Sequence, residues 1–209
     1  AQLTTTPLAT RASALRHALG YGGETAAPAP VAGTPTRARR PVVLVAGNIG
    51  ESERAIRRAG FTVQPVAFTP FDAEAAARVR HFETYNRTPA SQRVADIVRA
   101  LRAHPGASLV AAGPEALAGM LAAAIAPPRV AVLDVQGFDT ARDESFLEQL
   151  YIPGLRRAGD VATASELAAG TLRIHGAGAV FVAPGAQVQQ AVLGPADVVR
   201  VLRAASQKG

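Results

Sequence analysis

Short apolar runs alternate with amphipathic segments along the chain. Residues 41–46 form a continuous apolar run, and residues 61–68 form a second one that contains Pro65. Runs of this length are typical of strands buried on both faces of a parallel sheet, and a proline places its strand near an edge. Residues 51–59 lie between the two runs and predict a short helix with its arginines outside. We therefore expect a strand–helix–strand unit here, with its two strands parallel.

The same alternation continues toward the C-terminus. Thr88 and Pro89 supply a cap and a first-turn proline for a helix that runs to His104. The spacing of Thr163 and Glu166 is that of a capping box before a further helix. Strands are expected at 107–112, 129–134, 171–175 and 179–182, and helices at 114–125, 146–151, 163–170 and 195–205. This pattern predicts an α/β fold with three αβα layers around a mostly parallel sheet.

The first 40 residues differ from the rest of the chain. Residues 9–19 predict a short helix, and residues 22–40 are rich in Gly, Pro, Ala and Thr without any period. We expect two parts, an N-terminal helix with an extended arm at 1–40 and an α/β domain at 41–209. The chain begins Ala1-Gln2 without Met, as a signal-peptidase product or an artificial boundary would, and we expect an exported protein.

Composition and charge narrow the possible functions. The 209 residues are 48% hydrophobic and include no cysteine, which fits a globular chain and excludes disulfides and cysteine catalysis. The net charge of +6 comes almost entirely from arginine and favours an acidic partner, although solvated helix faces explain it as well. The arginines are scattered without interleaved aromatic residues, so nucleic acid is not expected. No apolar run reaches the length of a transmembrane segment. We expect a protein partner or a larger complex.

The stretch 107–120 is the organising feature of the domain. An apolar strand breaks at Gly113-Pro114 and continues as a helix with Leu117 and Met120 on one face. A sharp strand-to-helix turn of this kind presents the nucleophile in G-x-S-x-G enzymes, with the reactive side chain at the tip. Here the tip is glycine, so the pattern predicts the turn without the reactive atom.

The chain resembles the α/β-hydrolase superfamily, in particular its acetyl-xylan-esterase and prolyl-oligopeptidase-like branch. The resemblance rests on residues 81–88 (His-Phe-Glu-Thr-Tyr-Asn-Arg-Thr), on 93–97, and on the order of the strands before the turn, and it covers about residues 41–183. It implies a truncated α/β-hydrolase-like domain with its nucleophile at position 113. The chain departs from the family there, and it reads Ala46-Gly47-Asn48 where the family carries an oxyanion-hole His-Gly.

Candidate catalytic residues follow from the predicted sheet. Asp134 and His175 both fall at carboxyl ends of strands, where open α/β sheets build their sites, and an Asp–His pair would lie there. Ser52, in the turn after the first strand, is the serine nearest to this edge. The alternative is that Asp134 and His175 are structural groups hydrogen-bonded to nearby backbone.

Candidate binding residues are Asn48, Tyr85, Asn86, Arg87 and Glu115. Glu115 is either a general base or a favourable charge in the first turn of its helix, and the second role is preferred. The stretch 47–50 is similar to a phosphate-binding turn but lacks both G-x-G-x-x-G and the P-loop lysine, so a nucleotide is not expected. The four histidines show no metal-ligand spacing. We therefore expect neither a cofactor nor a metal.

Two functions remain open at this point. The first is a non-catalytic α/β-hydrolase-like accessory or binding subunit in an exported assembly. The second is a carboxylic-ester hydrolase of the acetyl-xylan type that uses a non-standard nucleophile. The glycine at position 113 favours the first, because turn geometry can position only a side chain that exists.

Overall fold

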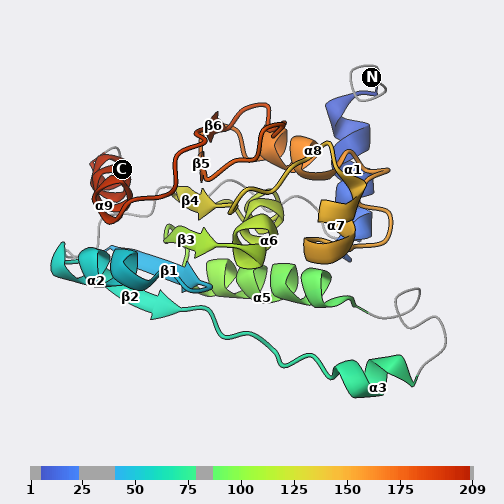
Figure 1. Ribbon diagram of the computed structural model, residues 1–209, viewed down its shortest axis with the longest axis horizontal. Coiled ribbons are helices and arrows are strands. Elements are labelled where there is room, and N and C mark those ends of the chain that lie inside the picture. The colour runs from blue at the N-terminus through green and yellow to red at the C-terminus, as the bar shows by residue number, and fades with distance from the viewer. Residues whose placement is uncertain (1–5, 24–40, 79–86, 208–209) are drawn as a thin grey trace.

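Six parallel strands form one sheet at the centre of the molecule (Figure 1). The computed structural model describes residues 6–23, 41–78 and 87–207. Within them the strand order is β2-β1-β3-β4-β5-β6, and every neighbouring pair is parallel. The three-layer α/β fold is confirmed. The strands are β1 (Val42–Ala46), β2 (Thr62–Pro65), β3 (Ser108–Ala112), β4 (Ala131–Asp134), β5 (Leu172–His175) and β6 (Gln187–Val188).

Helices cover the two faces of the sheet unequally (Figure 1). Two helices, α2 (Gly50–Arg58) and α9 (Pro195–Ser206), pack together on one face. On the other face, α5 (Pro89–Ala103) and α6 (Pro114–Ala123) pack on the strands, α8 (Asp160–Leu167) packs against α6, and α1 (Leu8–Ala18) packs against α8. Two shorter helices, α3 (Ala73–Ala77) and α7 (Asp143–Gln149), lie on connections between strands. No helix in the described ranges is long and apolar enough to cross a membrane.

Alternate residues of each strand enter two separate cores. In β1, Leu44 packs toward α5 and α6, whereas Val43 and Val45 pack toward α2 and α9. β3 follows the same rule, with Leu109 in the first core and Val110 in the second. Because successive side chains point to opposite faces of a sheet, a strand covered on both faces needs apolar residues at every position. This explains why the central strands read as continuous apolar runs.

The N-terminal helix is part of the first core. α1 lies where the sequence predicts a helix, and its Leu15 is fully buried in that core. Arg11 forms a two-pronged ion pair with Glu166 of α8, at 2.9 and 2.8 Å, and also donates to the hydroxyl of Thr163. The hydrogen bonds from Arg11 lower the pKa of Glu166. Residues 24–40 of the predicted arm lie outside the described residues.

The prediction of a strand at residues 179–182 is wrong. The segment is irregular, because Thr140 takes its hydrogen bonds: the backbone N–H of Thr140 donates to the carbonyl of Val180, and the Thr140 hydroxyl accepts from the N–H of Val182. The strand that completes the sheet is instead β6, which pairs with β5 through Arg173–Gln187 and Ile174–Val188.

Helix α8 begins earlier than its sequence pattern predicts. The prediction that Thr163 caps this helix is wrong, because the helix starts at Asp160 after Gly159, which has a left-handed backbone conformation. Thr163 is fully buried inside the helix and receives the hydrogen bond from Arg11. By contrast, Thr88 caps α5 as expected, since its hydroxyl accepts from the N–H of Ser91 at 3.2 Å.

Candidate functional site at the carboxyl edge of the sheet

The loops that follow β1, β3, β4 and β5 meet at one edge of the sheet. Strand order reverses between β1 and β3, with β2 on one side and β4 to β6 on the other. In open α/β sheets this switch point, at the carboxyl ends of the strands, is where ligands bind.

The sharp turn predicted between β3 and α6 is present. Gly113 has φ 66° and ψ −140°, a conformation that in practice only glycine adopts without strain. Its N–H donates to the carbonyl of Asp134 at 2.8 Å, which joins the turn to the neighbouring strand β4. Position 113 is thus held in a backbone geometry that would raise a side chain above the edge of the sheet.

Gln136 occupies the space above this glycine. A Cβ added to Gly113 would lie 2.9 Å from the side-chain Oε1 of Gln136. Gln136 itself has a positive φ of 48° and follows β4 by two residues. Sequence reasoning did not identify Gln136, because its place over Gly113 depends on the pairing of β3 with β4. The space that a side chain at position 113 would enter is taken by the neutral amide of Gln136.

Asp134 is fully engaged by backbone. Its Oδ1 accepts from the N–H of Gln136 at 3.0 Å, and its Oδ2 accepts from the N–H of Leu193 at 3.2 Å. The side chain is buried, and Gly176 lies so close that an added Cβ would overlap Oδ1. Asp134 therefore ties the turn after β4 to the segment that precedes α9.

His175 lies beside Asp134 at the end of β5. The two residues are partners in the β4–β5 register, and His175 as a residue is only 3% exposed. Its Nδ1 has no hydrogen-bond partner among the described residues. Burial lowers the pKa of His175, and Arg200 lowers it further, although Asp197, Asp134 and a backbone hydrogen bond at Ala191 oppose this. The imidazole is therefore neutral near pH 7.

The depressed pKa of His175 predicts a pH-dependent stability. Because folding lowers this pKa, the unfolded chain takes up the proton first as the pH falls below about 6.5, and the free energy of unfolding decreases until the folded form is also protonated. We expect His175→Gln to reduce the stability lost between about pH 7 and pH 5. Urea unfolding at several pH values measures this, with His17→Gln as the matched variant at an exposed histidine. Equal losses in wild type and His175→Gln would contradict the prediction.

Ser52 is not joined to Asp134 or His175. It lies on the buried side of α2, which follows β1, and β1 is separated from β4 by β3. At about 4.8 Å between neighbouring strands, β1 lies about 10 Å from β4 and about 14 Å from β5. No hydrogen bond within the described part of the chain connects these three side chains. Ser52, His175 and Asp134 are therefore not arranged as a serine–histidine–aspartate triad.

Glu115 and the loop containing Asn48 do come together. A Cβ on Gly47 would lie 3.1 Å from Oε2 of Glu115, whose Oε1 pairs with Arg93 at 3.3 Å. Asn48 is exposed beside this pair. Glu115 lies in the first turn of α6, and Glu51 lies in the first turn of α2. These carboxylates oppose the binding of phosphate to either helix N-terminus at the switch point.

The remaining binding candidates are only partly placed. Tyr85 and Asn86 lie outside the described residues. Arg87 is exposed just before Thr88, and its Nη2 lies 3.9 Å from where a Cβ on Gly20 would be, near the end of α1. The described residues contain no group of three or more His, Asp or Glu side chains arranged to hold a metal ion.

The carboxyl edge thus combines a sharp strand-to-helix turn with glycine at its tip, an aspartate bound to backbone and a buried histidine with a lowered pKa. No family model, curated protein or solved structure matches this chain.

Proposed function

We propose that this chain is a non-catalytic, α/β-hydrolase-like binding or accessory subunit that works in an exported protein assembly. The observation that carries the proposal is the turn after β3. Its tip is Gly113, and the amide of Gln136 takes the place of a nucleophilic side chain. A serine-type α/β-hydrolase needs an attacking atom at this tip within reach of a base, and glycine at position 113 supplies no such atom.

The neighbouring groups support the same function. An aspartate that orients a catalytic histidine needs a carboxylate oxygen directed at the imidazole. Both oxygens of Asp134 accept from backbone N–H groups, and no hydrogen bond among the described residues joins them to Nδ1 of His175. His175 is buried with a lowered pKa. Its Nδ1, the atom that a catalytic aspartate would contact, has no hydrogen-bond partner among the described residues. These residues serve the architecture of the edge rather than a reaction.

The test combines ester turnover with active-site labelling. The folded protein is incubated with a short-chain aryl ester and, separately, with a fluorophosphonate that reacts with activated serines. We expect no turnover and no labelling above that of the urea-denatured chain, because no serine is activated by a base. Ser52→Ala and Ser165→Ala are carried in parallel. Both serines are buried in helices, but Ser165 lies in α8 and its hydroxyl donates to the carbonyl of Ala162.

Labelling of the folded protein would overturn the proposal. Labelling that disappears in Ser52→Ala and persists in Ser165→Ala would identify the alternative, a carboxylic-ester hydrolase with a relocated nucleophile. Labelling that persists in both variants would equally reject a non-catalytic role and direct attention to another serine.

A further inference from the structure

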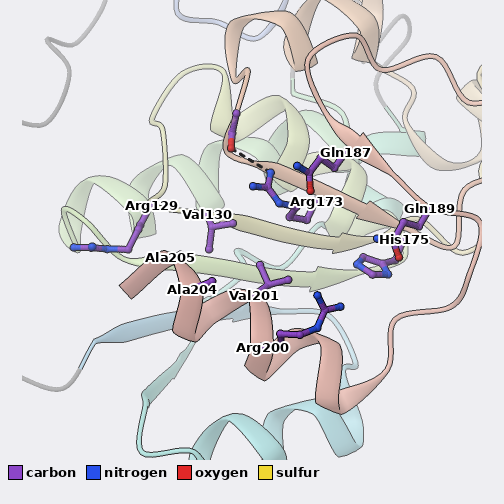
Figure 2. A pocket seen from close by; sticks show the side chains of 11 residues that line it. Arg129, Val130, Arg173, His175, Gln187, Gln189, Arg200, Val201, Ala204 and Ala205 are labelled. Atoms are coloured by element: carbon purple, nitrogen blue, oxygen red, sulfur yellow. Dashed lines mark hydrogen bonds between the residues drawn. The ribbon is translucent and has the colours of Figure 1, made fainter. Parts of the chain in front are cut away.

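A hollow of about 430 Å³ lies between α9 and the half of the sheet that α9 and α2 leave uncovered. Its floor includes Val130, Arg173 and His175, and Gln187 and Gln189 close it on the β6 side. α9 forms the opposite wall with Val201, Ala204 and Ala205 (Figure 2). Because the alanine side chains of α9 are small, they leave space between this helix and the strands.

The strand pattern explains why this face is polar. In β5, Leu172 and Ile174 enter the core on the far face, while Arg173 and His175 face α9. Strands β1 and β3 present valines on that same face, because α2 and α9 cover them. Gln187 pairs in register with Arg173, and Gln189 continues the strand by donating its N–H to the carbonyl of Ile174 at 2.9 Å.

The charges around the hollow are positive. Its lining includes Arg129, Arg173 and Arg200, which come from three different segments, and no acidic residue. Arg173 donates through Nη1 to the carbonyls of Gly170 and Leu172, which orients its guanidinium. Among the described residues, no carboxylate pairs with Arg129 or Arg173.

Two acidic groups lie close to the hollow without lining it. Asp197 pairs with Arg200 through one nitrogen, at 2.7 Å, and no other hydrogen bond from that guanidinium is found among the described residues. Asp134 lies beside His175, and backbone N–H groups occupy both of its oxygens. Figure 2 shows Arg200 reaching from α9 toward His175, with Gln189 beside that histidine. The cationic character of the hollow is therefore only partly offset.

We propose that this hollow binds a small organic oxyanion, with Arg173 and Arg200 holding its carboxylate or phosphate group and Gln187 and Gln189 meeting its hydroxyls. Guanidinium groups pair with carboxylate and phosphate oxygens through charge-assisted hydrogen bonds. A glutamine amide both donates and accepts, which suits a hydroxyl. The volume lies within the range of small-molecule sites. A sugar phosphate or a sugar acid combines both kinds of group.

The binding test uses four probes that separate these contributions. Glucose 6-phosphate and glucuronate carry hydroxyls with a phosphate or a carboxylate, inorganic phosphate carries the anion alone, and glucose carries the hydroxyls alone. Each is titrated into the full chain, and the side-chain amide signals of Gln187 and Gln189 are followed by NMR. We expect saturable shifts with at least one of the two sugar anions, weaker binding of inorganic phosphate and none of glucose. Which sugar anion binds more tightly identifies the anionic group.

Substitutions locate the site. We expect Arg173→Gln and Arg200→Gln each to weaken binding about 10-fold or more, because each removes a charge-assisted contact. Arg203→Gln is the matched control, since Arg203 lies on α9 one turn beyond Arg200 and does not line this hollow. It lines the neighbouring hollow beside α2, which Arg200 also lines. It should leave affinity within about 2-fold, as expected for a charge outside the site. If Arg173→Gln does not fold, the titration of Arg200→Gln alone tests whether the hollow is the binding site.

Three results would overturn the inference. They are the absence of saturable binding by either sugar anion, equal affinity in wild type and Arg200→Gln, and an equal loss in Arg203→Gln, which would indicate general charge attraction. The inference rests on the proposed binding role and deepens it. The two proposals are tested by different experiments, so one can be rejected without the other. Ester turnover would overturn the proposed function without affecting these titrations, and a failed titration would leave the catalytic test unchanged.

Discussion

Replacing Gly176 by alanine is expected to destabilise the fold by about 2–5 kcal/mol. The residue has φ +60°, a conformation that costs a non-glycine residue roughly 1–2 kcal/mol. The new Cβ would overlap Oδ1 of Asp134 and lie 3.2 Å from the N–H nitrogen of Gln136, and overpacking of this kind costs about 1–3 kcal/mol more. The free energy of unfolding in urea measures the sum.

Gly170→Ala separates the two contributions. Gly170 has φ +84° and follows α8, but nothing lies within 4 Å of an added Cβ. The Gly170→Ala variant should therefore lose only the conformational part of the free energy of unfolding, about 1–2 kcal/mol. Equal losses in Gly170→Ala and Gly176→Ala would contradict the close contact between Gly176 and the carboxylate of Asp134.

Asp134→Asn is expected to lower the free energy of unfolding by about 1 kcal/mol, because a partly buried donor loses its acceptor. Each carboxylate oxygen accepts from a different backbone N–H, one at Gln136 and one at Leu193. Asparagine keeps only one acceptor oxygen and turns an NH2 group toward the other N–H. Either orientation of the amide therefore leaves one donor unpaired. Urea unfolding at pH 7 measures the loss.

Asp139→Asn is the matched control for this substitution. Within the described part of the chain the Asp139 side chain accepts one hydrogen bond, at Oδ1 from the N–H of Ala141 at 2.8 Å, and an asparagine oxygen can take over that bond. We expect a change within about 0.5 kcal/mol, as for a surface substitution that keeps its contact. If Asp139→Asn costs as much as Asp134→Asn, the loss arises from removal of negative charge and not from the two backbone bonds.

These two predictions concern the region where the sequence places catalytic chemistry. Asp134 and Gly176 lie at the ends of neighbouring strands, and their contact orders the turn that brings Gln136 over Gly113. A strong effect on folding would show that the carboxylate acts as a structural clamp. This role agrees with the interpretation of Asp134 as a group hydrogen-bonded to backbone, which the sequence left open beside the catalytic one.

Strands buried on both faces could be located from the sequence, and short exposed ones could not. β1 and β3 are continuous apolar runs because helices cover both of their faces. β6 has only two exposed residues, Gln187 and Val188, so no pattern distinguishes it from a loop. Residues 179–182 carry an apolar run, but Thr140 satisfies their backbone groups outside the sheet.

Local sequence determined the strand-to-helix turn and the absence of a nucleophile at its tip. Gly113 and Pro114 suffice for both conclusions, since backbone conformation at the turn depends on residues adjacent in the chain. The local sequence also determined that the polar residues of β5 share one face of the sheet. Period-two alternation assigns Arg173 and His175 to the face opposite Leu172 and Ile174.

Only the tertiary structure decided what surrounds these residues. The amide of Gln136 reaches Gly113 through the pairing of β3 with β4, and the oxygens of Asp134 find donors at residues 2 and 59 positions away. The arginine-lined hollow depends on where α9 packs against α2, which leaves β5 and β6 uncovered. Contacts between distant segments follow from strand order and helix packing, and a single chain read by its local periodicity carries no direct record of either.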